Sequence, residues 1–375
     1  MMHRRPPVLI RSQVAHRWPI FLVLLALTGC LPVANAETIP PSPAALEQTA
    51  TTQPTILPTQ TPLPTATLVP TRRPETPAPT PWQFTFPTPN PAPVSAWRPP
   101  LYDVPWAPGP YDHFFFARPI AADNVNWPVA DYRYGGLFPG KEIIHTGIDI
   151  DAELGTPVLA AADGAVVWAG YGLYRGVYDT QDPYGLAVAI RHPFGYQGQR
   201  LYTVYAHMRK LYVTKGQVLH SGEALGEVGE TGFVTGPHLH FEVRVQNNDF
   251  FNTRNPELWI APPQGWGVLV GRITNTSGSY ITNLQVVVKT ADATRDWTVR
   301  TYGPEAVNND PYYKENMVLS DLPAGDYIVW VEYLGVRYNL TVQIHPGMVT
   351  YFTFTGKYLF HTDLPPAPDF PTPAP

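Results

Sequence analysis

Short runs of β-forming residues, separated by glycine, recur along this chain and restrict the folds open to it. Four of them lie at Gly164–Gly170, Leu186–His192, Leu201–His207 and His238–Val245. No segment longer than ten residues has a convincing helical period, and short strands separated by turn residues are typical of β-proteins. We therefore predict a mainly β chain, with an antiparallel, β-sandwich-like domain over residues 101–262 whose histidines line a groove.

A second set of alternating runs begins after Pro262-Pro263 and predicts a separate β-sandwich over residues 264–357. Within it, Gly271-Arg-Ile-Thr and Leu322-Pro-Ala-Gly-Asp-Tyr are similar to the carboxypeptidase regulatory-like family, which implies an immunoglobulin/transthyretin-like β-sandwich. This stretch has no cluster of ligand residues, so we expect a binding or spacer module rather than a second enzyme. Residues 358–375 form a proline-rich tail.

Proline and threonine dominate residues 37–100, which hold 18 of the 45 prolines of the chain together with 14 threonines. Proline has no amide donor and favours polyproline II, so a tract of this composition does not pack a core. We predict a disordered, semi-rigid linker that holds a catalytic domain away from a membrane.

The N-terminus, residues 1–36, has the pattern of an export signal. Basic residues precede the apolar run Ile20–Leu27, which is far shorter than the roughly 20 residues of a spanning helix. Cys30, the one cysteine of the chain, ends Leu27-Thr-Gly-Cys, which resembles the bacterial lipobox, where the cysteine is lipidated. The alternative is cleavage after Ala36. We therefore expect an extracytoplasmic protein of the cell envelope, either anchored to the membrane as a lipoprotein at Cys30 or secreted.

The charge of the chain argues against a nucleic-acid partner. The formal net charge is −5, charged residues make up 15% of the sequence, and no run of lysine and arginine lies beyond the N-terminus. Proteins that bind nucleic acid concentrate positive charge on one face. We expect no nucleic-acid partner, and we expect a monomer.

Two short motifs carry the chemistry: His145-Thr-Gly-Ile-Asp149 and His238-Leu-His240. Imidazoles and a carboxylate are the ligand types of catalytic zinc, which keeps one position open for water. Side chains two or four residues apart in a strand point to the same face, so each motif can present its pair together. His207 lies between the motifs in sequence. Taken alone, each pair could instead consist of surface residues at a spacing that occurs by chance.

The residues around these motifs resemble the lysostaphin/LytM-type zinc endopeptidases, which cut peptidoglycan cross-links. The matching pieces follow one another over roughly 100 residues: His145-Thr-Gly-Ile-Asp-Ile, Gly155-Thr-Pro-Val, Ala161-Ala-Asp-Gly-Ala-Val-Val, Tyr205-Ala-His, Lys215-Gly-Gln-Val, Gly229-Glu-Thr-Gly and Thr235-Gly-Pro-His-Leu-His-Phe-Glu-Val. The resemblance implies a duplicated hybrid motif fold, Zn2+ held by His145, Asp149 and His240, and catalytic imidazoles at His207 and His238. It also implies peptidoglycan as the partner and hydrolysis of its peptide bonds during cell-wall remodelling.

The chain departs from the common pattern of this family in two places. An aromatic insertion covers residues 172–183, and Asp151 stands where a small apolar residue is frequent. The insertion predicts altered substrate specificity. We expect Glu242, on the strand face of His240, either to orient a histidine or to be exposed to solvent, because metal ligands commonly need such partners. We expect a capping or loop role for His192 rather than metal ligation.

Two other classes of function remain open at this level. A LytM-like domain can serve as a non-catalytic scaffold that binds cell wall or activates another wall hydrolase; scaffolds of this kind usually lose ligands, whereas this chain keeps every one. A wall-binding adhesion protein would instead depend on the C-terminal sandwich. Deletion of residues 264–375 should abolish binding by an adhesin and spare cleavage by an enzyme.

Overall fold

The computed structural model describes residues 104–109, 111–120, 132–136, 144–303 and 307–366. Strands make up nearly all of their regular structure, and the helices in this part of the chain are short 3₁₀ turns: η1 (Phe250–Asn252), η2 (Pro256–Leu258) and η3 (Gly356–Tyr358). None of the described helices is long and apolar enough to cross a membrane. The prediction of a mainly β chain is confirmed. The predicted export signal and the predicted linker lie outside the described residues.

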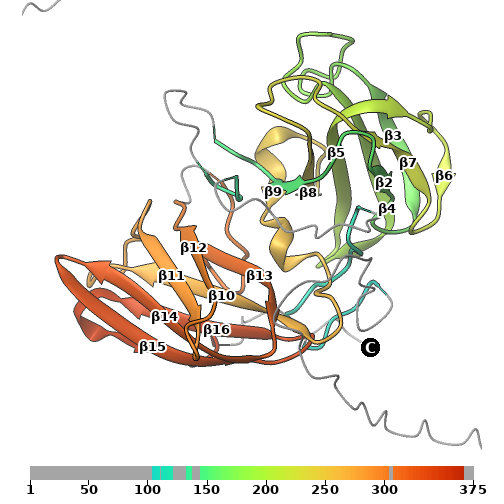
Figure 1. Ribbon diagram of the computed structural model, residues 1–375. Helices are drawn as coiled ribbons and strands as arrows, with labels where there is room; N and C mark the ends of the chain where they lie inside the picture. Colours follow the sequence, from blue (N-terminus) through green and yellow to red (C-terminus); the bar gives the residue numbers. More distant parts are fainter. Residues whose placement is uncertain (1–103, 110, 121–131, 137–143, 304–306, 367–375) are drawn as a thin grey trace, which may run out of the picture. The chain divides into compact units, whose positions relative to one another are not determined.

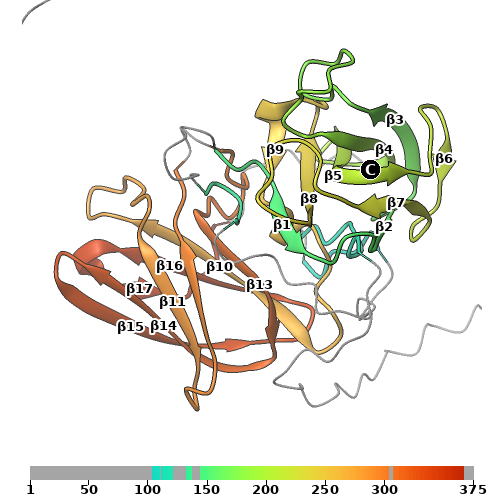
Figure 2. The same ribbon diagram turned by 45° about the horizontal axis from the view of Figure 1, so that its top comes forward.

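The first nine strands form one sheet, here called the N-lobe (Figure 1). They are β1 (Ile148–Asp151), β2 (Pro157–Leu159), β3 (Gly164–Gly170), β4 (Leu186–Tyr196), β5 (Gln199–Leu211), β6 (Val218–Leu219), β7 (Ala224–Val228), β8 (His238–Val245) and β9 (Thr253–Arg254). The strand order is β1-β8-β5-β4-β3-β6, while β7 joins β5 to β2 and β9 pairs with β8. All these pairs are antiparallel. The sheet therefore brings β1 beside β8, which is distant in sequence (Figure 2).

The four runs singled out in the sequence correspond to β3, β4, β5 and β8. β4 and β5 are longer than expected because they form one hairpin around Gln197 and Gly198, whose φ angles are 51° and 75°. Positive φ at both turn residues is what a two-residue hairpin loop with native strand twist requires. The remaining strands of the N-lobe contain two to five residues, which is too short for a periodic signal.

The C-lobe consists of two four-stranded sheets, as the sequence predicts for a β-sandwich. One has the order β13-β10-β16-β17 and the other β12-β11-β14-β15. Their bounds are β10 (Trp266–Thr274), β11 (Gln285–Thr290), β12 (Asp296–Arg300), β13 (Met317–Pro323), β14 (Gly325–Tyr333), β15 (Val336–Ile344), β16 (Val349–Thr355) and β17 (Phe360–His361). β10 and β16 run parallel. The apolar side chains between the sheets form one core, which includes Leu269, Val329 and Phe352.

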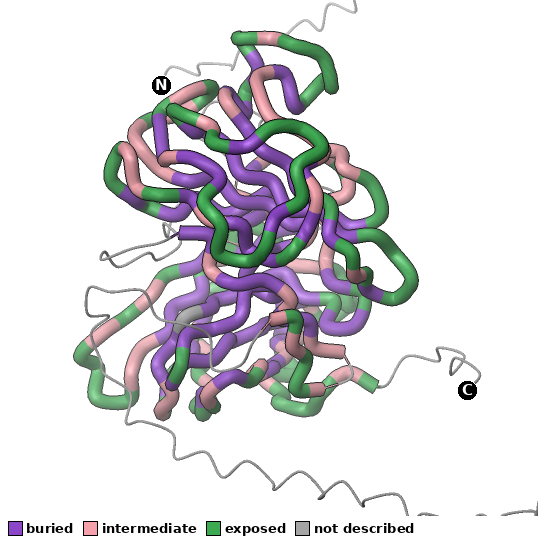
Figure 3. Tube along the Cα trace, turned by 90° about the vertical axis from the view of Figure 1, so that its right-hand side faces the viewer, coloured by how far each residue is buried: buried purple, intermediate pink, exposed green. Residues whose placement is uncertain are grey.

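β10 links the two lobes, which fall in the same compact unit of the chain. On one face, Leu269 and Ile273 belong to the core of the C-lobe. On the other face, Val268 and Val270 belong to the cluster that contains Trp259 and the apolar side chains of the N-lobe. Buried residues accordingly run through both lobes (Figure 3). Burial of apolar surface is the main favourable term in folding, so the two lobes support each other's stability.

Candidate metal centre

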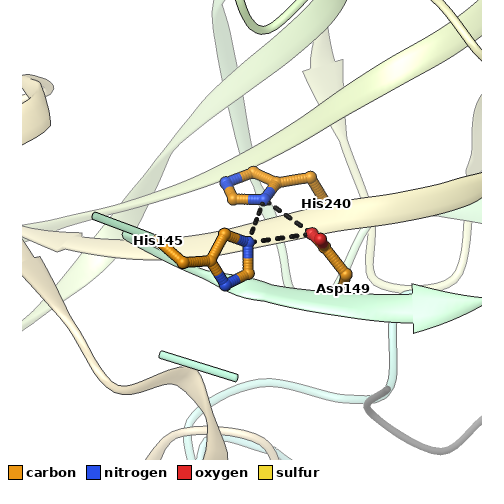
Figure 4. A group of neighbouring side chains, drawn as sticks. All are labelled: His145, Asp149 and His240. Atoms are coloured by element: carbon orange, nitrogen blue, oxygen red, sulfur yellow. Dashed lines mark hydrogen bonds and ion pairs between the residues drawn. The ribbon is translucent and has the colours of Figure 1, made fainter. Parts of the chain in front are cut away.

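Three side chains from two adjacent strands and the segment before them converge on one point. Asp149 of β1 is paired directly with His240 of β8. His240 Nδ1 lies 2.8 Å from Asp149 Oδ1 and 2.9 Å from His145 Nε2, and His145 Nε2 lies 3.0 Å from Asp149 Oδ1 (Figure 4). All three residues are buried. The structure thus brings together the three side chains that the family resemblance assigns to zinc.

His145 does not lie on the strand that carries Asp149, contrary to the expectation from strand spacing. β1 begins at Ile148, and His145 precedes it in an extended segment. The backbone of His145 is held there by Gly135, whose N–H donates to its carbonyl oxygen at 2.8 Å, and by Gly136, whose carbonyl accepts from its N–H at 2.9 Å. His145 and Asp149 therefore face the same point because Gly135 and Gly136 hold the backbone of His145 in place, and not because of strand periodicity.

Hydrogen bonds fix which nitrogen of each ligand histidine faces the centre. His145 Nδ1 lies 3.2 Å from the carbonyl oxygen of Arg133. A carbonyl oxygen only accepts, so Nδ1 carries the proton and Nε2 presents its lone pair. His240 Nε2 lies 3.1 Å from Glu242 Oε1, a carboxylate oxygen that only accepts, so Nε2 carries a proton and Nδ1 is the nitrogen that faces Asp149 and His145. Partners of this kind set the tautomer and the orientation of metal-binding imidazoles.

The donor set fits a zinc ion. Two imidazole lone pairs and a carboxylate oxygen meet in a buried place, and their mutual separations approach the roughly 3.3 Å expected for ligands with bonds of about 2.0–2.1 Å in a tetrahedron. Burial opposes a charge on His240, but Asp149 and Glu242 outweigh it and raise the pKa of His240 to about 9. The surroundings therefore favour positive charge at this point, as a proton or as a metal cation.

Glu242 is fully buried, which excludes the solvent-exposed alternative and supports the orienting one. Besides His240, its carboxylate accepts from Thr146 Oγ1 at 2.5 Å, from the Tyr184 hydroxyl at 2.8 Å and from Arg244 Nε at 2.7 Å. Burial alone would raise the pKa of Glu242, but Arg244 and the other donors lower it to about 2. Glu242 is therefore a carboxylate whose acceptor capacity is filled.

The two central residues of the first motif have separate structural roles. Thr146 donates to Glu242, as described above. At Gly147, an added Cβ would lie 2.4 Å from the carbonyl oxygen of Phe241 and 2.9 Å from the His240 ring. Real Cβ atoms do not approach other atoms so closely, so a glycine is required for the ring of His240 to occupy its position. Thr146 thus supports Glu242, and Gly147 leaves room for the His240 ring.

Two further imidazoles border the centre without belonging to the ligand triad. The His207 ring lies 4.8 Å from that of His238 and 5.5 Å from that of His240, measured between centroids. His238 Nε2 lies 3.5 Å from Asp149 Oδ2. Nδ1 of His207 donates to the carbonyl of Thr231 and Nδ1 of His238 to that of Gly236, each at 2.8 Å. In both rings Nε2 is consequently the nitrogen that can accept a proton.

Burial favours the neutral form of both of these rings. It lowers the pKa of His207 to about 3, assisted by the nearby His240 and His238, and it also lowers the pKa of His238. The His238 side chain is 13% exposed, against 6% for the whole residue His207. His238 is therefore the ring more open to an incoming molecule.

His207 has a φ of 61°, a left-handed backbone conformation that side chains other than glycine seldom adopt. Its N–H donates to the carbonyl of Tyr184 at 2.9 Å. The loop that carries Thr231 lies against Pro183. A Cβ added at Gly232 would lie only 2.4 Å from the carbonyl of Pro183, so a glycine is needed for this close approach. Strained conformations persist where the surrounding structure enforces them, and they concentrate at functional sites.

Other sequence expectations have clear outcomes. His192 lies inside β4 and not in a loop. Its buried ring forms hydrogen bonds with the carbonyl of Asp163 (Nδ1, 2.8 Å) and with Thr203 Oγ1 (Nε2, 2.9 Å). It has no place in the ligand triad. The insertion over residues 172–183 leads directly into Tyr184, whose backbone N–H and that of Tyr174 both donate to the Asp182 carboxylate. Its effect on specificity stays a prediction.

Sequence reasoning missed the functional importance of Thr146, Tyr184 and Arg133. It also missed the pairing of Arg244 with Glu242. A signal for that pairing is visible in His238-Leu-His-Phe-Glu-Val-Arg-Val, where histidines, an acid and a base alternate with apolar residues over a whole strand. All eight residues except His238 are buried, and a strand buried on both faces needs its charged side chains to be paired.

Replacing Glu242 by alanine is expected to weaken zinc binding by roughly 10- to 100-fold, because the tautomer and orientation of His240 lose their partner. It should also lower the free energy of unfolding by about 3–5 kcal/mol, because Arg244 is left as a buried, unpaired charge. A double variant, Glu242→Ala with Arg244→Met, should recover much of the stability but not the zinc affinity. Chelator competition and thermal unfolding separate the two effects; recovery of both would show that Glu242 only stabilises the fold.

Two imidazoles whose ring orientation is fixed and a carboxylate, with two neutral imidazoles beside them, are typical of a metal-dependent hydrolytic centre. Residues 143–252 match the family model described as Peptidase family M23. Residues 143–252 are thus similar to peptidases of family M23, and the predicted resemblance to the lysostaphin/LytM-type enzymes is confirmed over these residues. The resemblance of the C-lobe to the carboxypeptidase regulatory-like family stays a prediction.

Similar proteins match this chain over the same domain. The DD-carboxypeptidase/endopeptidase Mpg of Neisseria meningitidis is 43% identical over 102 residues, which cover 27% of this chain and 20% of that protein. The peptidoglycan DD-endopeptidase ShyC of Vibrio cholerae is 39% identical over 119 residues (32% and 24%). The Lipoprotein NlpD/LppB homolog of Pseudomonas aeruginosa is 39% identical over 120 residues (32% and 35%). The chain thus spans between a fifth and about a third of the length of these relatives.

Among solved structures, the catalytic domain of the antimicrobial peptidase lysostaphin from Staphylococcus simulans is 28% identical and covers 33% of this chain and 86% of that domain. The TM-score is 0.29. The description of the fold therefore rests on the strands and pairings given above.

Proposed function

We propose that this protein is an exported zinc metalloendopeptidase that hydrolyses peptide bonds in the cross-links or bridges of peptidoglycan during cell-wall remodelling. The observation that carries the proposal is the convergence of His145, Asp149 and His240, beside His207 and His238, within the residues that are similar to peptidases of family M23. Relatives named as DD-endopeptidases support peptidoglycan peptides as the substrate class. Zn2+ would be held by Nε2 of His145, Oδ1 of Asp149 and Nδ1 of His240.

The chemistry divides between the metal and the two neighbouring imidazoles. Zinc, when bound, supplies Lewis acidity that makes water acidic near neutral pH and polarises a carbonyl group. His238 and His207 are both neutral and both have Nε2 available, so each can carry a proton at that atom. One imidazole takes a proton from the attacking water at Nε2. That proton is then delivered to the leaving amine, from the same ring or from the other ring after transfer, so that both rings end neutral. The buried walls around the ligands exclude bulk water from this exchange.

We further propose the organisation of the whole chain from the same reasoning. It comprises an export signal (1–36), a linker (37–100), the peptidase domain (101–262), a β-sandwich and a proline-rich tail. The sandwich, expected over 264–357, extends to β17, which ends at His361, so the tail begins after that strand rather than at 358. The name of the NlpD/LppB homolog, a lipoprotein, supports anchoring at Cys30 over secretion after Ala36. The linker would then set how far from the membrane a monomeric enzyme reaches its substrate.

The proposed activity is tested by digesting purified peptidoglycan with the full mature chain and analysing the muropeptides by mass spectrometry. We expect cross-linked species to decrease and uncross-linked stem peptides with new amino and carboxyl termini to accumulate. Chelation should stop the reaction and added zinc should restore it. Unchanged muropeptides from zinc-loaded protein would contradict the proposal and favour the non-catalytic scaffold.

A further inference from the structure

A five-residue segment before the first ligand, residues 132–136, holds both metal-binding residues of the first motif. His145 is bonded through its backbone to Gly135 and Gly136, and through its ring to the carbonyl of Arg133. The N–H of Asp149 donates to the carbonyl of Tyr132 at 3.2 Å. This segment therefore helps to hold two of the three candidate ligands, in addition to the pairing of β1 with β8.

The side chain of Tyr134, in the middle of this segment, packs against the C-lobe. Tyr134 is buried, and its ring meets that of Tyr302 edge-on with centroids 5.5 Å apart, in a cluster that includes Val307. Its hydroxyl accepts from the N–H of Asn308 at 3.1 Å and lies 3.2 Å from the carbonyl of the same residue. It also lies 3.3 Å from Thr253 Oγ1, on β9 of the N-lobe.

Two further contacts lead from this segment to the C-lobe, one directly from Gly135 and one from Arg133 through Glu257 of η2. The Arg133 guanidinium pairs with the buried carboxylate of Glu257, and the other oxygen of Glu257 accepts from the N–H of Ser320, on β13, at 2.8 Å. Gly135 has a φ of 76°, and an added Cβ would lie 2.4 Å from Cβ of Tyr302. Tyr134 and Gly135 thus contact the C-lobe directly and Arg133 is joined to it through Glu257, while the segment holds the ligands on its other side.

We infer that Tyr134 and Glu257 are positioning residues of the metal centre, through which the C-lobe fixes His145 and Asp149. The inference rests on the proposed zinc centre and adds a role for the C-lobe that differs from the binding or spacer module expected from sequence. Ligands whose supports are fixed bind metal more tightly, because less order has to be imposed when the ion arrives. Deleting residues 264–375 would remove these supports and part of the shared core, so it would not separate an adhesin from an enzyme.

The test compares point variants of the full chain. Tyr134→Phe removes the hydroxyl that joins the segment to Asn308, and Glu257→Gln removes the charge that pairs with Arg133. The matched control is Tyr313→Phe, since the buried Tyr313 hydroxyl donates to Asp112 at a different contact between the lobes. We expect zinc affinity, measured by chelator competition, to fall about tenfold in the first two variants, at the lower end of the effect of a lost ligand support. It should change less than about twofold in the control.

A second readout uses the metal-free protein. Side-chain 15N spectra should show the Nδ1–H of His145 hydrogen-bonded and protected from exchange in the wild type and in Tyr313→Phe, and less protected in Tyr134→Phe. Equal zinc affinity in all variants, with the same loss of thermal stability in Tyr134→Phe and Tyr313→Phe, would overturn the inference and leave the C-lobe as a stabilising partner only. Failure of the wild type to bind zinc would instead contradict the proposed function.

Discussion

Replacing His240 by alanine is expected to abolish stoichiometric zinc binding. The variant loses the Nδ1 donor that lies 2.8 Å from Asp149 and 2.9 Å from His145, which leaves two ligands where catalytic zinc needs three. Loss of a direct ligand should cost more than the roughly 10- to 100-fold of a lost ligand partner. Metal analysis after dialysis against a weak chelator measures this, and peptidoglycan hydrolysis should disappear with the metal.

The control for this variant is His220→Ala. The His220 side chain is 77% exposed and pairs only loosely with Asp163, with nitrogen and oxygen 3.6 Å apart. The His220→Ala variant should therefore keep one zinc ion per chain and full activity. If His240→Ala also kept one zinc ion per chain, the assignment of the triad would be wrong.

Replacing His238 by alanine is expected to leave zinc binding intact and to reduce hydrolysis by about 10²- to 10⁴-fold, the usual contribution of a general acid or base. Its ring lies beside Asp149 but outside the triad of donor atoms, and its Nε2 can carry a proton. Parallel measurements of zinc content and of the rate of cross-link cleavage separate the two properties. His207→Ala should behave in the same way, because Nδ1 of His207 is also occupied by a carbonyl.

Added imidazole distinguishes these two variants. The His238 side chain is partly exposed, so a small imidazole can take its place and restore part of the activity. His207 is more deeply buried, and its variant should respond less. Loss of zinc from His238→Ala would contradict the division of roles and would make His238 a ligand.

The candidate ligands could be predicted from sequence because two short motifs place them. His238 and His240 are two residues apart, so any strand presents them on one face, and β8 does so. His145 was assigned to the right cluster for an incomplete reason, since it precedes β1 and is held by residues 133–136. Local periodicity contains no information about that second segment. The same limit applies to Tyr184, whose hydroxyl donates to Glu242 although the two residues are 58 positions apart in sequence.

The C-lobe shows how far the alternating apolar pattern after Pro263 predicts the structure. Alternating runs after Pro263 predicted a β-sandwich, and two four-stranded sheets lie there, but the runs also suggested a module separate from the metal centre. Val268-Leu269-Val270 is apolar at three successive positions, which is typical of a strand buried on both faces. In the structure, Val268 and Val270 pack in the cluster shared with the N-lobe, while Leu269 packs inside the sandwich. Which element covers the second face depends on contacts between distant segments.

The location of zinc in a crystal of the metal-loaded protein tests the central claim most directly. Anomalous scattering at the zinc edge should give one strong peak per chain, bonded at about 2.0–2.2 Å to Nε2 of His145, Oδ1 of Asp149 and Nδ1 of His240. His238 and His207 should lie next to the open coordination position without binding the ion. A peak at other residues, or one that involves fewer than these three donors, would contradict the account.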